Sequence, residues 1–390
     1  MKKTIVVFIG GYLPGKKYGG PVTSIENFVN QLCNEYNMKI ICNNHDLNEK
    51  EKYRNIQDGW NKVGNADVYY IKEKDYTAKK FEKIIAPFKD DIIMFYLSGI
   101  YYIKMNYNAI KLSKKLNIPV VLAPRGDLMK NTISMKSRIK KIKKLVFLKL
   151  CKGFSIFKGI YFQATSEEER DGLYNYLNIN KNRVFLIPNL PMVKKLKNNY
   201  FKKKNSLRIL FISRLMVKKN PLFALNVVGD ISDRFDIQFD LYGPKEDMEY
   251  WEKCVEKINE INSNKKNIKV SYKGCLNTVE AKNIYQEYEC FLFPTISENY
   301  GHVIVEAMLS DCPVVLSANT TPWDDYNNNG GYVIPLDKPE LFTKNLENIA
   351  SMSNQEYYEL IRLNRKYIEN KFRIEELIDS YRAMINLVSK

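Results

Sequence analysis

The chain has 390 residues, 45% of them hydrophobic, and its 61 lysines and arginines outnumber 44 aspartates and glutamates to give a formal net charge of +17. Single hydrophobic cores stop growing at about 250–300 residues, so this length favours two domains. The seven cysteines include no C-x-x-C pair, which argues against a disulfide scaffold and indicates a reducing, cytosolic compartment. Only two histidines are present, which argues against a histidine-based metal site.

The N-terminal half alternates short β-rich runs with helical stretches. Its first run, TIVVFIG (residues 4–10), is too short for the apolar core of a signal peptide and meets glycines instead of a cleavage site, so we expect a β-strand. Runs of the same kind lie at residues 38–44, 91–98, 118–126 and 159–166. Helical stretches such as 24–36 and 106–117 fall between them. This alternation is typical of a doubly wound parallel sheet.

A glycine-rich segment, IGGYLPGKKYGGPVTSIENF (residues 9–28), connects the first strand to the first helix, which Thr23 or Ser24 is expected to cap. Glycines let backbone amides approach an anion at a helix N-terminus. The segment matches neither G-x-G-x-x-G nor the P-loop pattern, which weakens a dinucleotide or nucleoside-triphosphate interpretation. A flexible strand-to-helix connection is the alternative.

A basic window without any acidic residue lies between Asp127 and Glu167. Its lysines alternate with apolar residues largely at helical spacing, and four of them are close together: Lys140, Lys141, Lys143 and Lys144. This pattern predicts an amphipathic surface that can lie on anionic lipid. The alternatives are a solvated face of a helix-rich insertion and a nucleic-acid surface, although no nucleic-acid module accompanies the charge. No apolar stretch approaches the ~20 residues that cross a bilayer.

Residues 191–206, PMVKKLKNNYFKKKNS, break the alternation with proline, asparagine and lysine and are expected to form a linker. Strands of a second alternation are expected at residues 207–214, 235–243, 267–274, 290–295, 312–318 and 331–336. The C-terminal residues have helical periodicity and predict two helices, of which the last is long enough to cross back onto the first domain. The expected domains are residues 1–195 and 206–372, with the crossing helix over 373–390.

Two cations follow the first strand of the second half, in LFISRLMVKKNP (residues 210–221). The buried strand ends at Ser213, and Arg214 and Lys219 come before the next helix. The carboxyl end of a strand in an open α/β sheet is where ligands bind, and two cations there suit a diphosphate. The alternative is that both are ordinary surface charges.

Two glutamates frame the segment SENYGHVIVEAM (residues 297–308). Glu298 is expected in the turn after a buried strand, and Glu306 in the helix that follows. The N-terminus of that helix, near Tyr300, Gly301 and His302, offers partial positive charge to a phosphate. Carboxylates accept pairs of hydroxyl hydrogens, so both glutamates are candidates for binding sugar hydroxyls. Alternatively, Glu298 only caps the helix. His302 is expected to pack or to face a phosphate rather than to bind a metal.

Seven segments occur in an order that is similar to a known family: GGPVTSIENFV, APRGDLM, ATSEEE, IPN, ISRLMVKKNP, ENYGHVIVEAM and NTTPWDD. With these segments, and with the E-x7-E spacing from Glu298 to Glu306, the chain resembles the retaining glycosyltransferases of family 4 over nearly its whole length. The resemblance implies the GT-B fold, an α/β architecture of two Rossmann-like doubly wound domains that face a central cleft. It also implies an N-terminal acceptor-binding domain and a C-terminal domain that binds a nucleotide sugar donor.

The resemblance further implies roles for the candidate residues. Arg214 and Lys219 would bind the donor diphosphate, and Glu306 would bind the ribose hydroxyls. Glu298 would contact the transferred sugar near its anomeric carbon. The remaining donor contacts would come from Asn299, Tyr300, Gly301, His302, Gly19 and Gly20. Arg214, Lys219 and the helix terminus would stabilise the leaving diphosphate without a metal or other cofactor, in a front-side displacement with retention.

Two departures from the family pattern concern Ser98, Gly99 and Asn189. Many relatives have a histidine where this chain has Leu97, Ser98 and Gly99, so the backbone near Ser98 or Gly99 is expected to replace the contact of that histidine with the donor sugar. Relatives often continue with glycine after the asparagine of IPN, and Asn189 is therefore assigned no role. Arg125, at the end of a predicted strand, is the best candidate for contacting a phosphate of acceptor or donor.

These features predict a cytoplasmic hexosyl- or N-acetylhexosaminyltransferase that is peripheral on the inner face of the cell membrane. It would move sugar from a nucleotide diphosphate sugar, with UDP as the expected nucleotide, to a glycan acceptor carried on a polyprenyl diphosphate, in surface polysaccharide synthesis. A soluble acceptor, a sugar-nucleotide epimerase of the same fold, and a non-catalytic basic protein that binds membrane or nucleic acid are the alternatives. An epimerase would not need the ordered set of Arg214, Lys219 and E-x7-E, and a basic binding protein would not explain the paired glutamates.

Overall fold

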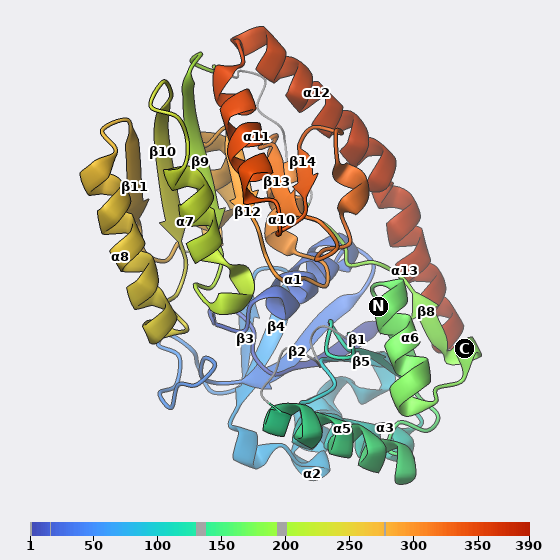
Figure 1. Cartoon of the computed structure of the whole chain (residues 1–390). Helices are drawn as coiled ribbons and strands as arrows, with labels where there is room; N and C mark the ends of the chain where they lie inside the picture. The colour runs from blue at the N-terminus through green and yellow to red at the C-terminus, as the bar shows by residue number, and fades with distance from the viewer. Residues whose placement is uncertain (1, 16, 130–137, 193–200, 277) are drawn as a thin grey trace. The chain divides into compact units, whose positions relative to one another are not determined.

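The computed structural model describes residues 2–15, 17–129, 138–192, 201–276 and 278–390. The chain divides into two compact units: residues 1–190 with 374–390, and residues 191–373. Each unit has one predominantly parallel sheet with helices packed on it (Figure 1). The predicted α/β class, with two doubly wound sheets, is confirmed.

The first unit is built on an eight-stranded sheet with the order β3-β4-β2-β1-β5-β6-β7-β8. Its strands are β1 (Thr4–Ile9), β2 (Asn37–Asn43), β3 (Trp60–Val63), β4 (Ala66–Ile71), β5 (Ile92–Ser98), β6 (Val120–Ala123), β7 (Tyr161–Ala164) and β8 (Val184–Leu186). Neighbours are parallel except β3 and β4, which are antiparallel. The sequence pattern does not predict β3, β4 and β8, because β3 and β8 are short edge strands and β4 alternates buried with half-buried residues.

Side chains of this sheet alternate between two apolar clusters, so helices cover both of its faces. Val6 and Phe8 of β1 belong to the cluster formed with α2 (Ala78–Ile85), α3 (Ile103–Leu116) and α5 (Arg138–Gly153). Ile5 and Val7 belong to the opposite cluster, formed with α1 (Gly20–Leu32) and α13 (Ile374–Val388). The first sheet is therefore the middle of three layers.

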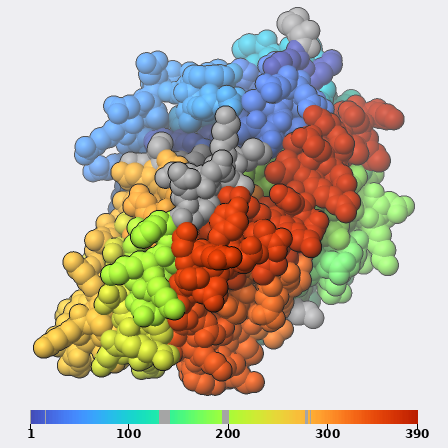
Figure 2. All heavy atoms as spheres, turned by 90° about the horizontal axis from the view of Figure 1, so that it is seen from above, coloured from blue at the N-terminus to red at the C-terminus, as the bar shows by residue number. Residues whose placement is uncertain are grey.

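The C-terminal helix α13 packs on the first unit. It buries Ile378, Tyr381 and Ile385, which share one helical face. Its surface residue Arg382 forms an ion pair of 2.6 Å with Glu35, which follows α1. The red C-terminal residues accordingly lie beside blue and green segments of this unit in Figure 2.

Helix α1 begins earlier than the sequence pattern predicts. Its N-cap is Gly19, with a φ of 66°, and its first residue is Gly20, so the expected cap at Thr23 or Ser24 is wrong. Proline fits the first helical turn, where no backbone donor is needed, and a Pro occupies that turn here. Glycine tolerates the positive φ that precedes it. Ser24 lies inside the helix, where its hydroxyl donates to the carbonyl of Gly20 at 3.1 Å.

The second unit has a six-stranded, fully parallel sheet with the order β11-β10-β9-β12-β13-β14. Its strands are β9 (Ser206–Ile212), β10 (Asp236–Tyr242), β11 (Ile268–Tyr272), β12 (Cys290–Phe293), β13 (Val314–Ser317) and β14 (Tyr332–Ile334). Its helices are α7 (Pro221–Gly229), α8 (Met248–Asn264), α9 (Thr278–Asn283), α10 (His302–Met308), α11 (Pro339–Ser351) and α12 (Asn354–Lys371). All six runs that the sequence predicts as strands are strands.

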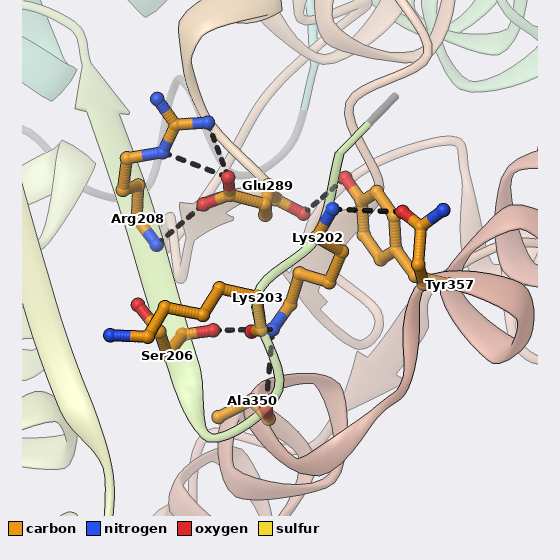
Figure 3. Close-up of polar contacts among 8 residues, drawn as sticks. Lys202, Lys203, Ser206, Arg208, Glu289, Ala350 and Tyr357 are labelled. Carbon is orange, nitrogen blue, oxygen red and sulfur yellow. Dashed lines mark hydrogen bonds and ion pairs between the residues drawn. The ribbon is translucent and has the colours of Figure 1, made fainter. Parts of the chain in front are cut away.

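Buried polar contacts hold the start of β9 (Figure 3). Lys202 is 3% exposed, and its ammonium donates to the carbonyls of Lys203 at 2.7 Å, Ala350 at 3.1 Å and Ser206. Burial lowers the pKa of Lys202 to about 8, against the opposing charge of Glu289. These contacts join the segment before β9 to the C-terminal end of α11.

Glu289, just before β12, receives a second set of contacts in the same view (Figure 3). Arg208 of β9 donates to its carboxylate through Nε at 2.8 Å and through its backbone amide at 2.7 Å. Tyr357 of α12 donates to its backbone carbonyl at 2.9 Å. The contacts between Arg208 and Glu289 thus join the amino ends of the two central strands, β9 and β12.

Candidate functional site

The strand order of the second sheet reverses between β9 and β12, which lie side by side. Ligands of open α/β sheets bind at the carboxyl ends of strands at such a switch point. The loops that leave these two strands are joined by hydrogen bonds: the Ile296 amide donates to the Lys218 carbonyl at 2.9 Å, and Asn220 Nδ2 donates to the Pro294 carbonyl at 3.1 Å. Two segments that were predicted separately therefore form one site.

Lys219 and Glu298 meet in this site as an ion pair. Their side chains are only 9% and 15% exposed, and the Glu298 amide donates to the Thr320 carbonyl at 2.7 Å, which fixes the loop. Burial lowers the pKa of Lys219, and the nearby charges of Lys218 and Arg214 add to this effect. The alternative that Glu298 caps α10 is wrong, because the N-cap residue is Gly301 and no side chain caps the helix.

Arg214 lies at the same edge and pairs with Glu246, at 3.0 Å. Glu246 is held by its amide, which donates to the Leu215 carbonyl at 3.2 Å. The two strand ends approach so closely that a Cβ at Gly243, whose φ is 132°, would overlap the Ser213 carbonyl. The sequence did not single out Glu246, which stands 32 residues from Arg214.

Glu306 lies on α10 and is half-buried. Tyr285, which is fully buried, donates from its hydroxyl to Glu306 Oε2 at 3.0 Å. Burial raises the pKa of Tyr285, and the charge of Glu306 raises it further, so Tyr285 is a neutral donor that orients a carboxylate. Nothing in the local sequence singles out Tyr285, which stands 21 residues before Glu306.

Aromatic rings fix the turn that contains Asn299, Tyr300 and Gly301. Trp323 Nε1 donates to the Tyr300 carbonyl at 2.6 Å, and the two rings lie 5.5 Å apart. Gly301 has a φ of 70°, and α10 begins at His302, whose ring packs 4.8 Å from that of Tyr300. The packing interpretation of His302 is thus consistent with the contacts it makes.

In the first unit, the corresponding reversal of strand order lies between β1 and β5. The glycine-rich segment follows β1, and a Cβ at Gly10 or Gly11 would overlap the ring of Tyr102 or Tyr18. Gly19 and Gly20 lie at the start of α1 in this unit, whereas the other candidate donor residues lie in the second unit.

Ser98 and Gly99, where the chain departs from the family pattern, also lie at this edge of the sheet. Ser98 is fully buried, and Gly99 has a φ of 88°. Its carbonyl accepts a hydrogen bond from Asn106 Nδ2 at 2.8 Å.

Arg125 follows β6 and does not stand alone. Its guanidinium donates to Tyr96 OH at 2.7 Å and to the side-chain oxygen of Asn189. Asn189, to which the sequence assigned no role, is 3% exposed. It lies 64 residues from Arg125, so only the fold brings them together.

The basic window forms α5, whose described part carries an apolar stripe. Ile142, Val146 and Leu150 of α5, with Phe154 directly after it, recur at every fourth position and are 50% to 76% exposed. Lys141 and Lys143 are exposed, and Lys144 lies 4.1 Å from the ring of Tyr101. The side chain of Lys140 is outside the described residues.

Within the described part of the chain, no three histidine, cysteine, aspartate or glutamate side chains gather as a metal-binding group. None of the helices described there is both long and apolar enough to cross a bilayer.

Parts of the chain are similar in sequence to known glycosyltransferases. Residues 192–371 match the family model of glycosyl transferases group 1. The chain is 26% identical over 231 residues to the UDP-N-acetylglucosamine–peptide N-acetylglucosaminyltransferase GtfA subunit of Streptococcus agalactiae, a match that covers 54% of this chain and 43% of that relative. It is 24% identical over 382 residues to an uncharacterized 41.2 kDa protein in the cps region of Klebsiella pneumoniae, covering 93% and 95% of the two chains.

Among solved structures, sucrose-phosphate synthase from Thermosynechococcus elongatus is similar, with a TM-score of 0.71 at 14% identity over 99% of this chain and 100% of that one. The chain spans less than half the length of its GtfA relative. The chain therefore has the GT-B fold, and its residues 192–371 are similar in sequence to the glycosyl transferases group 1 family.

Proposed function

We propose that the chain is a retaining glycosyltransferase of the family 4 type, which moves a hexose or N-acetylhexosamine from a nucleotide diphosphate sugar to a glycan acceptor. The observation that carries the proposal is the grouping of Lys219, Glu298, Arg214 and Glu306 around the switch point between β9 and β12. UDP is the proposed nucleotide, and the name of the GtfA relative, which includes UDP-N-acetylglucosamine, supports this choice.

In the proposed mechanism, the donor diphosphate takes the place of Glu298 beside Lys219. A buried lysine with a lowered pKa needs a nearby anion to remain protonated, and the diphosphate supplies two negatively charged phosphate groups. Glu298 is then released to accept hydrogen bonds from hydroxyls of the transferred sugar. Glu306, oriented by Tyr285, accepts hydrogen bonds from the ribose hydroxyls.

Cleavage of the sugar–phosphate bond places negative charge on the leaving diphosphate. Lys219 and Arg214 stabilise this charge, as do the backbone dipoles at the start of α10. The chain's own residues thus supply the electrostatic stabilisation. The acceptor hydroxyl attacks from the face that the diphosphate leaves, and its proton passes to the departing phosphate oxygen. Retention of configuration follows from this front-side geometry. The backbone of Asn299 to His302 is proposed to complete the donor contacts of the second unit. Gly19 and Gly20 are proposed phosphate contacts of the first unit.

The acceptor is proposed to be a saccharide on a polyprenyl diphosphate, in surface polysaccharide synthesis at the inner face of the cell membrane. The exposed stripe of α5, with lysines beside it, is complementary to anionic lipid: apolar side chains enter the lipid and cations remain at the head groups. The location of the Klebsiella relative in a cps region supports this pathway.

The donor proposal is tested by screening nucleotide sugars for release of nucleoside diphosphate. We expect turnover with at least one of them, and we expect Glu306→Ala to abolish it while thermal unfolding remains near that of the wild type. Turnover that survives in a folded Glu306→Ala variant would contradict the site. Conversion of the nucleotide sugar into an isomeric sugar, without transfer, would support an epimerase instead.

Membrane docking is tested separately, by sedimentation with anionic and with neutral liposomes. We expect binding to anionic liposomes only, and release when Lys141, Lys143 and Lys144 are replaced by glutamine or when Ile142 and Val146 are replaced by serine. Leu387→Ser, which removes an apolar residue of similar exposure on α13, is the matched control. Unchanged binding of both α5 variants would refute docking through α5.

A further inference from the structure

Arg125 follows β6 at the carboxyl edge of the first sheet, and its backbone has a φ of 58°. A residue other than glycine adopts this left-handed conformation only where its surroundings hold it there. Glu169, which is fully buried, accepts hydrogen bonds from the amides of Gly126 and Thr165 and so fixes the turn. The Arg125 side chain therefore leaves a backbone whose position is set.

Four hydrogen bonds run head to tail from its guanidinium. Arg125 Nη2 donates to Tyr96 OH at 2.7 Å, and Tyr96 OH donates to Gln163 Oε1. Gln163 Nε2 donates to Tyr381 OH at 2.7 Å, and Tyr381 OH donates to the Pro188 carbonyl at 3.0 Å. Each of the two hydroxyls accepts a hydrogen bond from the preceding member of the chain and donates one to the next, so these donors point the same way and the bonds polarise one another.

The chain of bonds closes into a ring. Asn189 follows Pro188, and its Oδ1 accepts a hydrogen bond from Arg125 Nη1. The amide of Gln163 is held in one orientation because Nε2 also donates to the Ile187 carbonyl at 2.9 Å. The guanidinium is thus held on two of its nitrogens by what we call the Arg125 ring: Arg125, Tyr96, Gln163, Tyr381, Pro188 and Asn189.

The burial of the ring shows why its polar groups matter. Tyr96 and Gln163 are fully buried, and Tyr381 and Asn189 are at most 3% exposed. Burial raises the pKa of both tyrosines, so their hydroxyls keep the protons on which the chain of bonds depends. Phenylalanine would fill the same space at either position, so packing alone does not require these hydroxyls. Arg125 itself is only half-buried.

We infer that the ring is a positioning device, in which Tyr96, Gln163, Tyr381 and Asn189 hold the Arg125 guanidinium in the orientation that binds a substrate phosphate. The inference rests on the proposed function, since that phosphate belongs to the acceptor or to the donor. Arginine grips phosphate through a planar fork, so its orientation decides its affinity. The C-terminal helix α13 thereby takes part in substrate recognition through Tyr381, without touching the substrate.

A double-mutant cycle on glycosyl transfer tests the ring, with Tyr381→Phe, Arg125→Met and both together. Tyr381→Phe keeps the aromatic ring and removes one hydroxyl, and we expect it to lower kcat/KM about fivefold to tenfold, as for one lost hydrogen bond. We expect Arg125→Met to lower kcat/KM about 100-fold, and the double variant to be no worse than Arg125→Met. The substrate whose KM rises carries the phosphate that Arg125 binds: a raised KM for the acceptor assigns the phosphate to the acceptor, and a raised KM for the donor assigns it to the donor.

Tyr357→Phe is the matched control, because Tyr357 is also buried and also donates to a backbone carbonyl, at the opposite ends of the strands in the second unit. It should leave transfer unchanged. Arg125→Lys, which keeps the charge and loses the fork, replaces Arg125→Met in the cycle if the methionine variant does not fold. Additive losses in the cycle, or an equal loss in Tyr357→Phe, would overturn the inference while leaving the proposed function intact. Absence of nucleoside diphosphate release by the wild type would overturn the proposed function, and with it the substrate role of Arg125.

Discussion

Replacing Lys219 by methionine removes a buried cation and keeps most of the side-chain volume. Lys219 is 7% exposed and lies in the loop that hydrogen bonds join to the loop of Glu298. At so dry a position, one preorganised donor to a developing negative charge contributes about 3–4 kcal/mol, which corresponds to about 10²–10³ in kcat. We therefore expect Lys219→Met to lose about 10²–10³ in kcat for nucleoside diphosphate release.

The assay is a coupled measurement of nucleoside diphosphate at saturating nucleotide sugar, with thermal unfolding as the check on the fold. Lys218→Met is the control, because it removes the adjacent charge while the carbonyl of Lys218 still accepts from Ile296. We expect it to retain most of the activity. A folded Lys219→Met variant with kcat within about twofold of the wild type, far less than the loss of a preorganised donor would cause, would refute the reasoning. So would an equal loss in Lys218→Met.

Three further predictions concern single groups. Tyr285→Phe leaves Glu306 without the hydroxyl that orients it, and we expect nucleotide affinity measured by calorimetry to fall about tenfold; unchanged affinity would remove Tyr285 from the site. Because burial lowers the pKa of Lys219, the lysine loses its charge at a pH below its ordinary pKa of 10.5. The affinity for nucleoside diphosphate should therefore fall over the alkaline range in the wild type and stay level in Lys219→Arg. Identical pH profiles of the two proteins would contradict this. Burial also lowers the pKa of Lys202 from 10.5 to about 8, so between these pH values the unfolded chain binds more protons than the folded chain. The wild type should therefore gain stability relative to Lys202→Met as pH rises through this window, by at most about 3 kcal/mol in urea unfolding. Parallel curves of stability against pH would show that the Lys202 pKa is not lowered.

Strands β12 and β13 of the second unit could be predicted because their apolar runs are continuous, and β10 and β11 because apolar residues alternate with polar ones. A fully parallel sheet covered by helices buries both faces of its strands, and this leaves a strong pattern in the sequence. Because β9 and β12 are such strands, the positions of Arg214, Lys219 and Glu298 at strand ends could also be predicted. The antiparallel pair β3 and β4 leaves no such pattern, since these strands include half-buried residues.

The partners of the site residues could not be predicted, because long-range pairing is decided by the fold. Glu246 stands 32 residues from Arg214, and Asn189 stands 64 residues from Arg125. The capping error at α1 has a local cause: hydroxyl residues suggested a cap, but a proline in the first turn and the positive φ of Gly19 start the helix earlier. The change in interpretation is largest for Asn189, which the family pattern led us to dismiss and which the structure places against a guanidinium.

The central claim is that the second unit binds the diphosphate of a nucleotide sugar through Lys219 and Glu306. Thermal unfolding in the presence of UDP, ADP and GDP tests it most directly, because a ligand that binds only the folded state raises the unfolding temperature by mass action. We predict a saturable rise of several degrees with at least one of these nucleotides, UDP first, that is lost in the Lys219→Met/Glu306→Ala double variant. No rise with any of the three, or a rise that survives in the double variant, would contradict the claim.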